Sequence, residues 1–160
     1  MNHVHFSSKY SSWRTPPDLL ARVQAEYPLA IDVCATEGHQ VCPAYIPPNA
    51  LVVDWRSEAA GAGYRTDRTF GWMNPPYGRG IGVWVQKAAK TAADGLGMVC
   101  LLPARTDTRW WHDYCEPVLR GKRPGEVVFL RGRVKFLDAG GVAKHPAPFP
   151  SVIVVFKVAL

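Results

Sequence analysis

One four-residue motif in the chain carries groups that suit chemistry on a planar amine. Residues 74–77 read Asn-Pro-Pro-Tyr and directly follow an apolar run. The side chain of Asn74 offers an amide oxygen, and Pro75 offers a backbone carbonyl with no proline amide hydrogen to compete for it. The fixed φ angles of the two prolines hold that carbonyl in one direction. Two acceptors directed at one point suit an amino group that has two hydrogens.

The exocyclic N6 of adenine is an amino group of this kind, and conjugation with the ring makes it a poor nucleophile. Hydrogen bonds from its two hydrogens to Asn74 and Pro75 would pull the nitrogen toward sp³ geometry, which frees the lone pair to attack a sulfonium methyl. Positioning and electrostatic preorganisation would lower the barrier without a general base. We therefore predict that Asn74, Pro75, Pro76 and Tyr77 form a catalytic motif.

This chemistry also needs an aromatic pocket for the base. A base inside a duplex must be flipped out before a side chain can reach its amine. Tyr77 can stack on the base, a contact that contributes about 1–3 kcal/mol in proteins that bind single strands. We expect Tyr77 and Phe136 to form the pocket.

The motif has three other interpretations. Asn-Pro-Pro-Tyr can be merely the turn that ends a strand. It can also serve methylation of another planar amine, such as cytosine N4 or a protein glutamine, although Asn rather than Ser at position 74 favours adenine over cytosine. Finally, the chain can be a catalytically inactive DNA-binding module that kept the fold, against which the intact motif argues.

The elements around the motif indicate a layered α/β fold. Apolar runs predict strands at 29–34, 51–54, 69–73, 96–102, 126–130, 133–137 and 151–156. Helical spacing predicts helices at 15–27, 83–93 and 107–114, while 1–14 is expected to be an irregular arm and 56–68 a loop. Strands that alternate with helices form mostly parallel sheets covered on both faces. The last strands lack an intervening helix, so we expect an antiparallel edge and a single domain over 1–160.

Polar residues lie at or near the ends of three of these strands. Asp32, Asp54 and Asn74 each follow an apolar run. Ligands of open α/β sheets bind at the carboxyl ends of strands. We therefore expect the three side chains to converge on one site.

Composition favours a soluble protein with a polyanionic partner. The chain has 160 residues, a formal net charge of +6 and a pI of about 9.3, which suits DNA. No apolar run reaches the roughly 20 residues that span a bilayer, and we expect no signal peptide, no membrane association and a cytoplasmic location. The four cysteines form no Cys-x-x-Cys pair and the five histidines are scattered, so neither a disulfide framework nor a metal site is expected.

Basic residues crowd one part of the chain. They lie between positions 120 and 135, with Glu126 as the only acidic residue among them: Arg120, Lys122, Arg123, Arg131, Arg133 and Lys135. A solvated rim would also account for them, but DNA phosphates are the better match once the adenine chemistry is considered. Arg105 and Arg109 follow a strand end near the expected site and suit either DNA contact or structural ion pairs. We predict DNA contacts at Arg105, Arg109, Arg131, Arg133 and Lys135.

An ordered set of segments resembles a known family over nearly the whole chain. The segments are Trp13-Arg-Thr-Pro-Pro17, Ile31-Asp-Val-Cys-Ala35, Val53-Asp-Trp55, Asn74-Pro-Pro-Tyr77, Leu102-Pro-Ala-Arg-Thr-Asp-Thr-Arg-Trp-Trp111, Phe129-Leu-Arg-Gly-Arg-Val-Lys-Phe136 and Phe149-Pro-Ser-Val-Ile-Val-Val-Phe156. In this set the chain resembles the phage-type DNA N-6-adenine-methyltransferases (Dam) and, more distantly, the gamma-class adenine methylases. The resemblance implies a Rossmann-like methyltransferase fold, S-adenosylmethionine as cofactor, DNA as substrate and a phage or prophage origin in a bacterial host, with restriction-modification as one setting.

The resemblance also implies roles for individual residues. Thr15 and Pro16 would contact the methionine end of the cofactor. Asp32, with the backbone near Cys34 and Ala35, would form the first cofactor-binding turn.

Further along the chain, the resemblance places Asp54 and Trp55 by the cofactor adenine, with Asp54 accepting from its amino group. Asn74, Pro75 and Tyr77 would hold the target adenine, and Phe136 would stack on its other face.

The chain departs from the family pattern at the first turn. It lacks the Gly-rich Asp-x-Gly-x-Gly sequence and keeps only Gly38, and only Glu37 is a candidate to hold the ribose hydroxyls. No separate target-recognition domain is expected, so recognition of the DNA sequence would fall on loops 56–68, 105–112 and 138–148.

Overall fold

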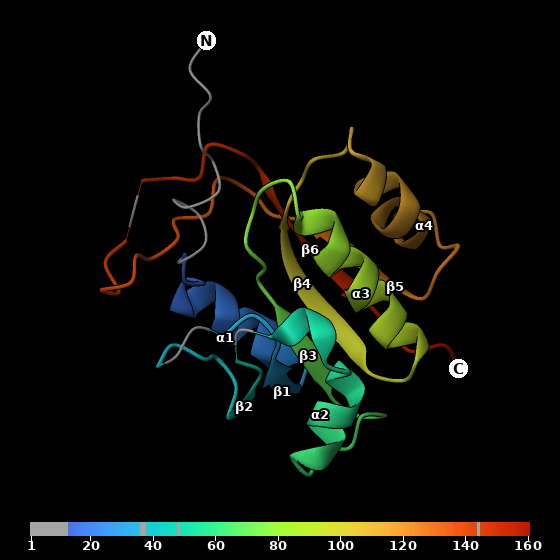
Figure 1. Ribbon diagram of the computed structural model, residues 1–160. Helices are drawn as coiled ribbons and strands as arrows, with labels where there is room; N and C mark the ends of the chain where they lie inside the picture. Colours follow the sequence, from blue (N-terminus) through green and yellow to red (C-terminus); the bar gives the residue numbers. More distant parts are fainter. Residues whose placement is uncertain (1–12, 36–37, 48, 144) are drawn as a thin grey trace.

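The sheet at the centre of the molecule is mostly parallel. The computed structural model describes residues 13–160 except 36–37, 48 and 144. In this part of the chain six strands follow the order β2-β1-β3-β4-β6-β5 (Figure 1). The strands are β1 (Leu29–Asp32), β2 (Ala44–Tyr45), β3 (Phe70–Met73), β4 (Gly97–Pro103), β5 (Gly125–Phe129) and β6 (Ser151–Phe156). β2, β1, β3 and β4 pair in parallel, whereas β6 pairs antiparallel with both β4 and β5.

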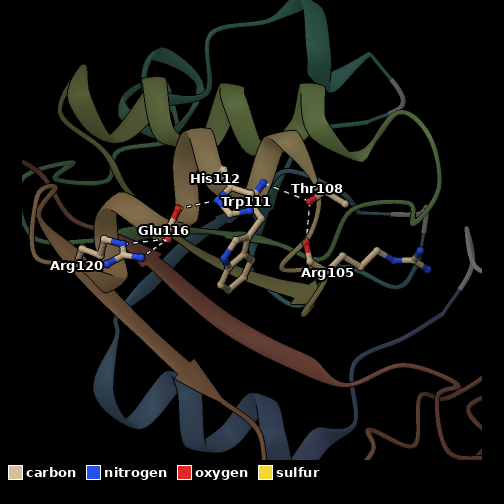
Figure 2. Close-up of polar contacts among 6 residues, drawn as sticks. All are labelled: Arg105, Thr108, Trp111, His112, Glu116 and Arg120. Atoms are coloured by element: carbon tan, nitrogen blue, oxygen red, sulfur yellow. Dashed lines mark hydrogen bonds and ion pairs between the residues drawn. The ribbon is translucent and has the colours of Figure 1, made fainter.

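Helices cover both faces of this sheet. They are α1 (Pro17–Glu26), the 3₁₀ turn η1 (Ala50–Val52), α2 (Trp55–Gly61), α3 (Ile81–Ala93), the π-helical turn η2 (Trp111–Cys115) and α4 (Glu116–Leu119). Figure 2 shows α3 and the η2–α4 segment on one face and α1 on the other. The predicted α/β class, with a mostly parallel sheet and an antiparallel edge, is confirmed.

The core forms around the two strands with continuous apolar runs. Every residue of β4 and of β6 is buried, and each of these strands has a neighbouring strand on both edges. Burial on both faces explains why these runs do not alternate with polar residues. On the opposite face, Tyr27 at the end of α1 packs edge-on against Phe70 at a ring-centroid distance of 5.2 Å.

The strand predicted at 51–54 and the first part of the loop predicted at 56–68 are wrong, whereas residues 62–68 form a loop as expected. Residues 51–54 are not a strand, since η1 occupies Ala50–Val52 and Val52 is 83% exposed. α2 begins at Trp55 and runs into the expected loop as far as Gly61, and Asp54 is its N-cap, whose Oδ1 accepts from the Ser57 amide at 2.7 Å. Trp55 and Ala59 are buried one helical turn apart. The cap and this apolar pair outweigh the β propensity of the preceding residues.

Two further predicted elements differ from the structure. Residues 133–137 form no strand, and in this segment only Leu137 pairs, through isolated bridges with Arg14 and Ala143. The helix expected at 107–114 begins at Arg109 and continues beyond that range, through η2 and α4. The helix begins after Thr108, whose hydroxyl donates to the Arg105 carbonyl at 2.7 Å and accepts from the Trp111 amide at 3.3 Å (Figure 2). Among the described residues, no helix combines the length and apolarity needed to cross a membrane.

Candidate active site

The carboxyl ends of β1 and β3 open onto a cavity of about 350 Å³. These strands pair in parallel, with Asp32 opposite Trp72, and Asn74 follows the end of β3. Asp32 and Asn74 both line the cavity, together with Thr15 and Cys34. The structure therefore brings together two of the three polar side chains expected to converge at the strand ends.

Two residues near the start of the chain, Trp13 and Thr15, bind the side-chain amide of Asn74. Its Nδ2 donates to the Trp13 carbonyl at 3.2 Å and to the Thr15 hydroxyl oxygen at 3.3 Å. An asparagine amide has two hydrogens and one acceptor oxygen. Because both hydrogens are engaged, Oδ1 is the group that this side chain has left for a ligand.

Tyr77 anchors the motif in the sheet. Its side chain is 5% exposed, and its hydroxyl donates to the Leu101 carbonyl of β4 at 3.1 Å. Burial raises the pKa of the Tyr77 phenol, so it stays protonated and remains a donor. Its ring lies edge-on to Phe136 at 6.0 Å and to Phe149 at 5.4 Å.

Trp13 covers the aromatic residues behind the motif. Its indole lies nearly parallel to Phe136, with centroids 5.0 Å apart and planes inclined by 28°, and stacks on Phe149 at 6.3 Å. Phe136 is only 1% exposed. Phe136, which was expected to stack on a base, is therefore buried and in contact with an aromatic ring of the protein's own chain.

Asp32 closes the turn that follows β1. Its Oδ1 accepts from the Cys34 amide and its Oδ2 from the Val41 amide, each at 3.0 Å. Burial raises the pKa of the Asp32 carboxyl, and the two backbone hydrogen bonds oppose that shift. The carboxylate thus fixes the backbone of the turn. Ala35 is half-buried in the turn, while Glu37 lies outside the described residues.

Comparison with known proteins supports one family. The sequence model of the DNA N-6-adenine-methyltransferase (Dam) family matches residues 5–159. The chain belongs to the Dam family. Membership implies DNA adenine N6-methyltransferase activity, the use of S-adenosylmethionine and DNA as substrate. A search of curated proteins returned no match.

The cavity at the ends of β1 and β3, called the main cavity below because Asp32 and Asn74 line it, fits the cofactor that the Dam family implies. Its volume lies in the range of about 300–1,000 Å³ that is typical of small-molecule sites. Polar groups of Asp32, Asn74 and Thr15 share the lining with apolar side chains such as Trp72 and Leu20. Such a mixed lining suits S-adenosylmethionine, which combines the charged groups of its methionine part and its ribose hydroxyls with a flat adenine ring.

Two residues expected at the cofactor lie elsewhere in the Dam-family fold. Trp55 is fully buried, and its Nε1 donates to the Ala50 carbonyl at 2.7 Å while its ring stacks on Trp84 at 6.1 Å. Asp54 caps α2, and the Ser57 hydrogen bonds lower the pKa of its carboxyl. Neither side chain lines the cavity. The structure therefore does not bring Asp54 and Trp55 to Asp32 and Asn74.

The basic residues divide into two groups. The Arg105 guanidinium lies 5.8 Å from the centre of the Phe149 ring, beside the aromatic cluster, and Arg109 is exposed. Figure 2 shows Arg105 extending away from Glu116, which pairs instead with His112 and Arg120.

Arg131, Arg133 and Lys135 line a second cavity of about 400 Å³ against α1. Pro16, expected at the cofactor, lines this second cavity, whereas Thr15 lines the first.

Sequence reasoning gave no specific role to two of the site residues. Phe149 completes the aromatic cluster, and its position between two prolines directly before β6 was the available signal. Trp13 entered only as part of the segment 13–17 that carries the family resemblance, yet its carbonyl accepts from Asn74 Nδ2. In the described part of the chain, no three His, Cys, Asp or Glu side chains are grouped as a metal site would require.

Proposed function

We propose that this Dam-family protein methylates N6 of an adenine flipped out of DNA, with Asn74 and Pro75 as the groups that accept its two hydrogens. The observation that carries the proposal is the anchoring of Asn74. Both Nδ2 hydrogens are engaged by Trp13 and Thr15, so Oδ1 is available as a fixed acceptor beside the main cavity.

The chain's own residues contribute positioning rather than proton transfer. When bound, S-adenosylmethionine supplies an electrophilic methyl on sulfur. Asn74 Oδ1 and the Pro75 carbonyl accept from the target amine, draw it toward sp³ geometry and aim its lone pair into the cavity. One of the two amine protons leaves to solvent after methyl transfer, so no side chain with a tuned pKa is needed. Acceptors that are already oriented avoid the cost of reorganisation during the reaction.

The cofactor contacts are assigned to the residues that surround the main cavity. Asp32 would hold the turn whose backbone at Cys34 and Ala35 faces the cofactor, and the Thr15 hydroxyl would contact its methionine end. We leave the side chains of Asp54 and Trp55 out of this set, because neither lines the cavity.

The base would lie between the motif and the aromatic cluster. Tyr77 is fixed by its hydrogen bond to β4, and Phe136 offers a flat ring behind it. Because Trp13 lies on Phe136, a base that stacks on Phe136 must displace the indole. The bicyclic indole is close to a purine in size and shape, so a base could take its place on Phe136.

The experiment that tests the function identifies the methylated product. DNA is incubated with the protein and labelled S-adenosylmethionine, digested to nucleosides and analysed by mass spectrometry. We expect N6-methyladenine, and Asn74→Ala serves as the inactive control. N4-methylcytosine or label on protein would support the alternative amine substrates. DNA binding without cofactor binding or any methylated product would identify an inactive DNA-binding module.

A further inference from the structure

The second cavity is a basic groove that lies next to the cavity lined by Asp32 and Asn74. It lies between α1 and residues 130–137, which Figure 1 shows in orange beside the blue start of that helix. Pro17 and Leu137 line both cavities. The two cavities are therefore separated by shared side chains and lie next to each other.

The charge of this groove is not neutralised from within the described residues. Its lining includes Arg22 on α1 and Arg131, Arg133 and Lys135 on the facing segment, but Asp18 is the only carboxylate. Of the four cations, only Arg133 has a hydrogen bond to the described protein, to the Ala147 carbonyl at 3.3 Å. Four cations around a hollow of about 400 Å³ make it attractive to an anion.

A short connection joins the groove to Asn74. The Arg14 amide donates to the Leu137 carbonyl, and the Leu137 amide donates to the Arg14 carbonyl, each at 2.9 Å. Arg14 lies between Trp13 and Thr15, the two residues that accept from Asn74. The segment that carries the cations is thus tied by backbone hydrogen bonds to the residues that orient the catalytic amide.

We propose that the groove formed by Arg22, Arg131, Arg133 and Lys135 binds a backbone phosphate of the DNA strand that carries the target adenine. The inference rests on the proposed function, because it takes the flipped strand as the occupant. A phosphate is the anion that DNA presents next to every base, and the cations on two facing elements can contact it from both sides. Binding energy gained here, away from the reacting amine, would hold the strand while Asn74 engages the base.

The test compares two triple variants that lower the net charge equally. The groove variant is Arg22→Gln, Arg131→Gln and Lys135→Gln, which leaves Arg133 and its hydrogen bond intact. The control variant changes three exposed cations outside the groove: Arg56→Gln, Arg68→Gln and Lys122→Gln. For each protein, duplex DNA binding and KM for DNA are measured over a series of salt concentrations, with S-adenosylmethionine affinity as a control measurement.

We expect the groove variant alone to show a weaker salt dependence. The slope of log K against log salt should flatten by about 0.9 for each phosphate that the protein no longer neutralises. KM for DNA should rise by about tenfold or more while kcat at saturating DNA and cofactor affinity change little. Equal slopes in the two triple variants would mean that net charge alone attracts DNA, and the proposal would fail.

Two further measurements separate the possible failures. If the groove variant unfolds, Asp18→Asn tests the same site with the opposite sign, since removing the groove's carboxylate should tighten DNA binding; unchanged binding would count against the groove. If wild-type protein yields no N6-methyladenine but the slopes differ as expected, the groove stands and the proposed function fails. If methylation proceeds and the slopes are equal, the function stands and the groove inference fails.

Discussion

Replacing Asn74 separates the two tasks that the structure gives to this side chain. Asn74→Ala removes the Oδ1 acceptor and both Nδ2 hydrogen bonds, to Trp13 and Thr15. Each hydrogen bond contributes about 0.5–1.5 kcal/mol net, so the free energy of unfolding should fall by about 1–3 kcal/mol. Loss of one preorganised partner for the reacting group lowers kcat by about 10²–10³-fold in comparable enzymes.

Asn74→Asp is the matched comparison. It keeps an acceptor for the target amine but loses both donors, so only the Thr15 hydroxyl can restore a contact by donating to the new carboxylate. We expect kcat between those of the wild type and Asn74→Ala. If Asn74→Asp is as inactive as Asn74→Ala, the orientation imposed by Trp13 and Thr15 matters more than the acceptor itself.

The assay measures methyl transfer under single-turnover conditions, with labelled S-adenosylmethionine and DNA at saturating enzyme. Cofactor affinity, measured by calorimetry, should change by no more than about threefold, which is under 1 kcal/mol. Chemical denaturation gives the change in stability separately. If Asn74→Ala keeps kcat within about tenfold of wild type, equivalent to about 1.4 kcal/mol, then Asn74 does not activate the amine and the mechanism is wrong.

Three further changes test the residues that support the site. Tyr77→Phe should lower the free energy of unfolding by about 0.5–1.5 kcal/mol, because the hydrogen bond to Leu101 is lost. We expect kcat to be largely kept because the ring remains, and a loss of kcat as large as that of Asn74→Ala would show that the hydroxyl acts in the reaction. Gly125→Ala should destabilise the sheet by about 3 kcal/mol, since φ is +150° and a Cβ would lie 2.0 Å from the Val155 carbonyl oxygen; an unchanged denaturation midpoint would contradict this packing. Glu126→Gln should flatten the acid limb of a stability-pH profile. Hydrogen bonds from Lys157 and Tyr27 lower the pKa of Glu126 below 4.5. The stability that Glu126 contributes is therefore present above pH 4.5 and is lost as pH falls through the lowered pKa. An acid limb as steep as that of wild type would exclude this contribution.

Much of the sheet and the centre of the site could be predicted from the sequence. The continuous apolar runs that became β4 and β6 have no competing interpretation, and the absence of a helix after β5 correctly indicated the antiparallel edge. The strand before Asn74 and the strand before Asp32 are parallel neighbours. Their carboxyl ends lie at the same edge of the sheet, so the side chains at these ends lie close together whatever conformation the connecting loops adopt.

What escaped prediction depends on competition between local and distant contacts. The apolar run before Asp54 suggests a strand, yet the side chain of Asp54 caps a helix that buries Trp55. The alternation of Val134 and Phe136 also suggests a strand, but their burial comes from packing under the N-terminal segment rather than from a sheet neighbour. Pairing partners over 100 positions away leave no signal in a local pattern.

The position of β6 has a consequence for biosynthesis. The last strand of the chain lies between β4 and β5, and Arg14 near the start pairs with Leu137 near the end. A nascent chain that has not yet emerged beyond Ser151 leaves both β4 and β5 with an open edge, because their common partner is missing. Contacts this distant in sequence form late in folding. The site can therefore assemble only after β6 (Ser151–Phe156) has been synthesised, and products truncated before Ser151 should leave DNA unmarked.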